Sequence, residues 1–107
     1  MSVLVVETYS VNPEKAALFA PRLQEFLRYK DSHPEVFPSL RSWKLFRQNV
    51  GSVVGSYLEI WEYDDMAAVK EAERATEDDE GMRAISAGFH ELLQPGTFAT
   101  GVWSLVA

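Results

Sequence analysis

Two glutamates stand among aromatic residues in segments whose pattern is typical of β-strands. In "GSYLEIWEYDD", Glu59 lies between Tyr57 and Trp61, and the alternation of faces along a strand places these three side chains on one face. Glu7 has a similar setting in "SVLVVETYSV". If the two strands are antiparallel neighbours, charge repulsion and burial among aromatic rings would both raise a carboxyl pKa. We therefore predict that Glu7 and Glu59 form a catalytic pair that acts as acid or base on an enolisable substrate.

A structural role for the two glutamates is the alternative. Arg41, Lys44 and Arg47 lie in or beside another predicted strand and could form ion pairs with the carboxylates across a dimer. A cation within hydrogen-bond reach would favour this interpretation. Carboxylates that open onto a cavity would favour catalysis.

Large aromatic residues accompany the glutamates and predict a binding surface for a small molecule. Such rings can line a flat apolar pocket suited to a polycyclic or phenolic ligand, but they can equally fill a dimer interface, where aromatic residues are enriched. The predicted substrate-binding residues are Tyr9, Trp43, Tyr57, Trp61 and Tyr63.

The two histidines supply a further proton carrier but only a weak metal signal. His33 lies in "SHPEVFP", a loop that could cover a cavity entrance, and we predict a catalytic proton-transfer role for it; a solvated loop residue is the alternative. His90 follows an apolar helical stripe and is interpreted as a surface or boundary residue. The acidic run 73–83 lacks the ligand spacing of a calcium loop. No metal site and no cofactor are predicted.

The elements that must position these residues follow the order strand, helix, strand, strand, helix, strand. Asn12-Pro13 and Asp64 or Asp65 are typical helix starts, and Pro21 predicts a kink around 17–21. The fold class is therefore α+β, a ferredoxin-like β-α-β-β-α-β arrangement with a four-stranded antiparallel sheet and a split second helical region. The expected strands are 2–11, 40–49, 53–63 and 98–106, and the expected helices are 12–32, 66–75 and 82–93.

The two faces of the expected sheet differ in character. Leu4, Val6, Leu58 and Ile60 share one face, which we expect to meet the helices. The aromatic and acidic residues would then lie on the open face. A contiguous exposed aromatic surface implies a partner, and we predict a homodimer through the open sheet face.

Composition limits the remaining possibilities. A chain of 107 residues is expected to form one domain, 1–107, with a core of its own. The absence of cysteine excludes disulfides and thiol chemistry, which suits a cytoplasmic protein. The net charge of −6 without a basic cluster argues against nucleic acid and anionic membranes as partners. The first ten residues match neither a secretory signal nor a membrane span.

Two segments carry a resemblance to a known superfamily. "ETYSVNPEKAALF" is similar to the first strand and helix start of the dimeric α/β-barrel superfamily, with Glu14 where glycine is common, and "YLEIWEYDDMAAVKEA" is similar to its third strand and following helix. Within that superfamily the chain most resembles the small NIPSNAP-like and antibiotic-monooxygenase-like proteins.

The resemblance implies a fold more strongly than a reaction. It implies that two subunits pack their sheets into a shared barrel, with Glu59 pointing into the dimer cavity. It also implies a cofactor-independent monooxygenase or isomerase that acts on an aromatic or polyketide-like molecule. The alternative is a non-catalytic dimeric module that binds a ligand or serves a stress response. The histidine ligand of heme-degrading members has no clear match.

Overall fold

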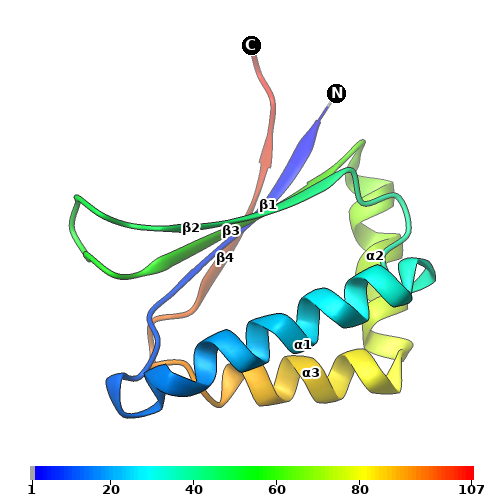
Figure 1. Ribbon diagram of the computed structural model, residues 1–107. Coiled ribbons are helices and arrows are strands. Elements are labelled where there is room, and N and C mark those ends of the chain that lie inside the picture. The colour runs from blue at the N-terminus through cyan, green and yellow to red at the C-terminus, as the bar shows by residue number, and fades with distance from the viewer. Residues whose placement is uncertain (1) are drawn as a thin grey trace.

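The computed structural model describes residues 2–107, and its sheet confirms the predicted element order. Four antiparallel strands, ordered β2-β3-β1-β4, form one layer, and the helices cover one face of it (Figure 1). The strands are β1 (Val3–Tyr9), β2 (Ser42–Arg47), β3 (Tyr57–Tyr63) and β4 (Ala99–Ser104). The helices are α1 (Phe19–Ser32), α2 (Met66–Asp78) and α3 (Glu80–His90), with short 3-10 turns η1 (Pro13–Leu18) and η2 (Pro34–Val36). This is the predicted ferredoxin-like α+β arrangement.

The two later helices begin at aspartates that satisfy free backbone N–H groups. Asp65 accepts from the N–H of Ala68 at 2.8 Å at the start of α2. Asp79 accepts from the N–H of Met82 at 2.8 Å at the start of α3. The predicted acidic interruption between these helices is therefore reduced to a single capping residue, Asp79.

The first helical region differs from the expected single kinked helix. Residues Pro13–Leu18 form a 3-10 turn, and the α-helix begins only at Phe19. Pro21 consequently lies in the first turn of α1, where a backbone N–H has no partner inside the helix in any case. The irregular 3-10 segment ends before Pro21, so α1 needs no kink to accommodate the proline.

The assignment of the sheet faces to helices and solvent was wrong. Trp61 lies against Phe26 of α1, with ring centroids 5.8 Å apart, and against Phe37, with centroids 6.1 Å apart. Two residues further along β3, at its last residue, Tyr63 packs with Val69 of α2. The aromatic and acidic face thus meets the helices. Strand alternation determines which residues share a face, but the covered face is decided by the aromatic and aliphatic side chains that the helices supply.

The open face consequently carries the aliphatic residues. β1 and β3 pair so that Leu4, Val6, Leu58 and Ile60 point away from the helices, and β2 and β4 add Phe46 and Trp103 on this side. Phe46 and Trp103 are 49% and 64% exposed. Glu59 therefore points into the interior of its own chain rather than toward a cavity shared by two sheets. No helix within residues 2–107 is both long enough and apolar enough to cross a bilayer.

Candidate functional site

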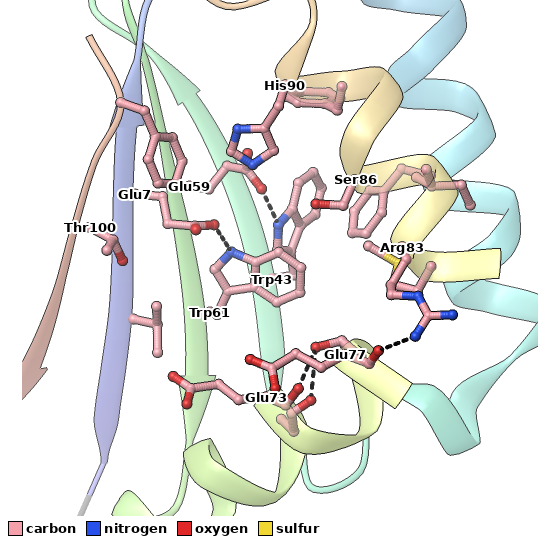
Figure 2. Close-up of a pocket in the computed structure, with 18 of the residues that line it drawn as sticks. Glu7, Trp43, Glu59, Trp61, Glu73, Glu77, Arg83, Ser86, His90 and Thr100 are labelled. Atoms are coloured by element: carbon pink, nitrogen blue, oxygen red, sulfur yellow. Dashed lines mark hydrogen bonds between the residues drawn. The ribbon is translucent and has the colours of Figure 1, made fainter. Parts of the chain in front are cut away.

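A cavity of about 690 Å³ lies between the sheet and the helices. This volume falls within the range of roughly 300–1,000 Å³ that is typical of small-molecule sites. Figure 2 shows Glu7 and Glu59 pointing into it from the sheet, and Ser86 and His90 pointing into it from α3. Leu23 and Phe26 supply the α1 side. The cavity therefore joins a sheet wall that carries the two carboxyl groups to a helical wall of mixed apolar and polar side chains.

The strand register brings the two predicted carboxylates side by side. Glu7 and Glu59 are direct partners in the antiparallel β1–β3 ladder, on the face that lines the cavity. Residues directly opposite each other in such a ladder have Cβ atoms about 4.5–5.5 Å apart. This confirms the neighbouring strands and the shared face on which the prediction of a carboxyl pair depends.

Aromatic donors hold both carboxyl groups. The Tyr9 hydroxyl donates to Glu59 Oε2 at 2.7 Å, and the Trp43 indole N–H donates to Glu59 Oε1 at 2.9 Å. The Trp61 indole N–H donates to Glu7 Oε1 at 2.9 Å. Among the described residues, hydrogen bonds thus engage both oxygens of Glu59 but only one oxygen of Glu7. Glu59 is fixed as an acceptor, whereas Glu7 keeps one oxygen for another partner.

Burial gives Glu7 a proton affinity suited to chemistry near neutral pH. Burial raises the pKa of Glu7 from 4.5 to about 7, the negative charge of Glu59 adds to this increase, and the hydrogen bond from Trp61 opposes it. At neutral pH the group is therefore close to half ionised. A carboxyl in this state can either accept or donate a proton.

The tyrosines on the same wall remain protonated at neutral pH. Burial and the charge of Glu59 raise the pKa of Tyr9 far above its usual value, since an ionised phenol would lie beside a carboxylate. Burial raises the pKa of Tyr63 to about 12, with further contributions from Glu7 and Glu73. Tyr9 therefore acts as a hydrogen-bond donor, and its bond keeps Glu59 in place.

The predicted cations do not accompany the carboxylates within this chain. Arg41 pairs with Asp64 at 2.6 Å, at an exposed edge of the structure. Lys44 is opposite Ile60 in the β2–β3 ladder and so belongs to the open face. Within residues 2–107, the carboxyl pair forms no ion pair and accepts hydrogen bonds from two indole N–H groups and a phenol.

Four of the five predicted aromatic contacts line the cavity. Tyr9, Trp43, Trp61 and Tyr63 do so together with the carboxyl pair. Tyr57 does not, because its ring stacks on Phe19 with centroids 4.4 Å apart, at the beginning of α1. Tyr57 thus lies outside this cavity, because the start of the first helix covers this part of the face.

The two histidines lie in different surroundings, and only one of them borders the cavity. His33 stacks on Tyr29 with ring centroids 3.9 Å apart, and its Nδ1 lies 2.9 Å from Ser32 Oγ. It does not line the cavity, so the expected place at the cavity entrance is wrong. His90 is exposed on the rim of the cavity, in agreement with its interpretation as a surface or boundary residue. Its spacing of four residues from Ser86 is the sequence signal that could have identified it.

Sequence reasoning also missed the charged residues near the junction of α2 and α3. Glu73 and Glu77 reach the cavity from α2, and Arg83 reaches it from α3 (Figure 2). The Arg83 guanidinium donates to the backbone carbonyl of Glu77 at 3.0 Å. The spacing of four residues between Glu73 and Glu77 indicates one helix face, but only the packing of α2 shows that this face borders a cavity. No group of three or more potential metal-ligating side chains occurs in the part of the chain that the structure describes.

No protein-family model and no curated protein sequence matches the chain. Solved structures do match. A candidate antibiotic biosynthesis monooxygenase from Caulobacter crescentus is 21% identical, with a TM-score of 0.71 over 99% of this chain and 91% of that one. A NIPSNAP family protein from Agrobacterium tumefaciens is 12% identical, with a TM-score of 0.75 over 98% and 86%.

A third match has a described activity. SnoaB from Streptomyces nogalater, a cofactor-independent oxygenase, is 20% identical, with a TM-score of 0.62 over 99% of this chain and 94% of that one. The chain therefore has the fold of the antibiotic-monooxygenase-like and NIPSNAP-like proteins, as the sequence resemblance predicted. At these identities the likeness establishes the fold and leaves the reaction to be argued from the site.

Proposed function

We propose that the protein is a small enzyme that binds an aromatic or polyketide-like molecule in the cavity and removes an acidic proton from it through Glu7. The observation that carries the proposal is the position of Glu7, a cavity-lining carboxyl with a pKa of about 7 and one oxygen without a partner among the described residues. A base whose pKa lies near the working pH combines a useful ionised fraction with a useful driving force for proton transfer.

The two carboxyl groups have different roles in the proposed reaction. Glu7 touches the bound molecule and takes its proton. Glu59 is a positioning residue, because Tyr9 and Trp43 occupy its oxygens and its charge raises the proton affinity of Glu7. Removal of a proton from an activated CH₂ group leaves an enolate beside the newly protonated Glu7, so the net charge within the cavity does not change.

Two subsequent reactions of the enolate are compatible with the residues of the site. Return of the proton to a different carbon gives an isomer, and no other reactant is consumed. Reaction of the electron-rich enolate with dioxygen converts the CH₂ group to a carbonyl and releases one water molecule. The likeness to SnoaB, described as a cofactor-independent oxygenase, and to a candidate antibiotic biosynthesis monooxygenase supports the second, monooxygenase-like outcome.

A tricyclic anthrone tests this proposal, because it carries an acidic CH₂ group between aromatic rings. We expect the protein to accelerate both exchange of this hydrogen with deuterated solvent and consumption of oxygen. Glu7→Gln should reduce both rates by about 100-fold or more. Glu71→Gln is the matched control, since Glu71 is exposed on α2 and does not line the cavity.

The pH profile separates catalysis from simple binding. The rate should rise with pH through about 7, where Glu7 becomes ionised, and level off above it. Binding of the anthrone without exchange or oxygen consumption would instead favour the non-catalytic ligand-binding module. Equal rates for the wild type and Glu7→Gln would remove Glu7 from the mechanism.

We also propose that a second copy of the chain covers the open sheet face. The aromatic stripe that first indicated a dimer faces the helices, so support for the proposal now comes from the aliphatic residues opposite. Leu4, Val6 and Ile60 lie on this face, flanked by the exposed rings of Phe46 and Trp103. Lys44 and Glu62 also lie on this face, and a cluster of large apolar side chains beside them is uncommon on the surface of a monomer.

A further inference from the structure

Carboxylates surround the candidate cavity on two sides. Glu7 and Glu59 belong to the sheet wall, and Glu73 and Glu77 reach the cavity from α2 (Figure 2). The positive groups on the lining are Arg83 and the ionisable His90, both exposed on α3. The Arg83 guanidinium is engaged by the carbonyl of Glu77. The balance of charge facing a bound molecule is therefore negative.

The pKa values of residues on the cavity wall indicate the same negative electrostatic potential. Glu59 raises the pKa of Glu7, and Glu7 and Glu73 both raise the pKa of Tyr63. Each increase means that a further negative charge at this wall is disfavoured. An anionic ligand would meet the same repulsion, whereas a positive charge would be attracted.

The aromatic lining adds a second attraction for cations. Trp43 and Trp61 have ring centroids 6.2 Å apart, and Phe26 lies 5.3 Å and 5.8 Å from them. Aromatic ring faces attract cations, and tryptophan does so most strongly. Both indole N–H groups donate to carboxylates, and hydrogen bonds to charged groups polarise the donor, which enriches the ring in electrons. Carboxylates and electron-rich rings together are the elements of an organic-cation site.

We infer that the cavity selects an aromatic molecule that carries a positive charge, such as a protonated amine or a quaternary ring nitrogen, over its neutral and anionic counterparts. This names the substrate class for the proposed function and rests on the cavity being its ligand site. The flat ring system lies among the aromatic side chains, and the positive charge lies toward the carboxylates.

Three tricyclic probes of similar size test the inference. N-methylacridinium, N-methylacridone and anthracene-9-carboxylate are cationic, neutral and anionic, and their binding can be followed by quenching of tryptophan fluorescence. We expect the cation to bind at least about tenfold more tightly than the anion, with the neutral probe between them. Equal affinities, tighter binding of the anion, or binding of none of the probes would overturn the inference.

Matched variants separate the cavity from the acidic surface of the whole protein. Glu73→Gln and Glu71→Gln make the same change of net charge on the same helix, but only Glu73 lines the cavity. Glu73→Gln should weaken N-methylacridinium binding about two- to fivefold, which is typical of a single partly exposed charge, and leave N-methylacridone unchanged. Equal effects of the two variants would show that the cation binds elsewhere and would also overturn the inference.

These experiments distinguish failure of the inferred charge preference from failure of the proposed function. If N-methylacridone binds as well as the cation and the anthrone exchanges its proton, the charge preference is wrong and the enzymatic proposal stands. If the cation is preferred but no proton is exchanged, the cavity is a cation-binding site and the enzymatic proposal is wrong.

Discussion

Replacing Glu7 by glutamine should change the pH dependence of stability, because this carboxyl changes its proton affinity when the chain folds. Burial and the charge of Glu59 raise its pKa from 4.5 to about 7. The folded protein therefore holds this proton over a pH range in which the unfolded chain has released it. The stability that the protonated group contributes is complete below pH 4.5 and is lost as pH rises through about 7.

The size of the effect follows from the interval between these two values. At about 1.36 kcal/mol per pKa unit, the interval from 4.5 to about 7 corresponds to roughly 3 kcal/mol. The side chain is only partly buried, so solvent screening reduces this to about 2 kcal/mol. Glutamine keeps the shape and does not titrate, and its amide oxygen can still accept from the Trp61 indole. We expect the free energy of unfolding of Glu7→Gln to exceed that of the wild type by about 2 kcal/mol more at pH 8 than at pH 4.5.

Urea denaturation at both pH values measures this difference. Other titrating groups affect the wild type and the variant alike, so the change in their difference isolates Glu7 and its repulsion from Glu59. Glu71→Gln serves as the control for a change of net charge and should show much the same offset at both pH values. A difference for Glu7→Gln that does not grow with pH, or that is larger at pH 4.5, would refute the assignment of a raised pKa to Glu7.

Two further predictions concern the support of the cavity and the open face of the sheet. Tyr9→Phe removes a hydrogen-bond donor from buried Glu59 and should lower the free energy of unfolding, measured in urea, by about 1–3 kcal/mol. Tyr57→Phe alters a ring outside the cavity and should lower the free energy of unfolding by less. Equal decreases would contradict the role of the Tyr9 hydroxyl. Trp103→Ser should leave the melting temperature of the monomer nearly unchanged, because Trp103 is exposed, but should weaken self-association in sedimentation experiments at micromolar concentration. A wild type that sediments only as a monomer would contradict the proposed dimer.

Strand alternation was sufficient to predict the carboxyl pair. Glu7 and Glu59 each lie in a strand-like segment, and the ferredoxin-like order makes those strands neighbours. The same alternation could not show which face the helices cover, because each face contains enough apolar residues to pack against a helix. Phe26 and Phe37 supply large rings that fit Trp61, and this packing places the aromatic side inward.

Contacts between distant segments explain the other differences. Tyr57 is excluded from the cavity by Phe19, which depends on where the first α-helix begins. The 3-10 turn ahead of Pro21 displaces the beginning of α1 to Phe19. Helix propensities of individual residues locate such boundaries poorly. His90 borders the cavity because α3 forms the wall opposite the carboxyl pair, and the helical periodicity of α3 alone does not determine that placement.

A direct titration of the glutamate carboxyl groups tests the central claim, that the cavity contains a carboxyl poised near neutral pH. Carbon-13 NMR of side-chain labelled glutamate follows each carboxyl as pH is raised from 3 to 9. We predict one resonance that titrates near pH 7 in the wild type and is absent from Glu7→Gln, because Glu7 is desolvated beside Glu59. If every glutamate of the folded wild type titrates below about pH 5, near the value of an ordinary carboxyl, the account of the site is contradicted.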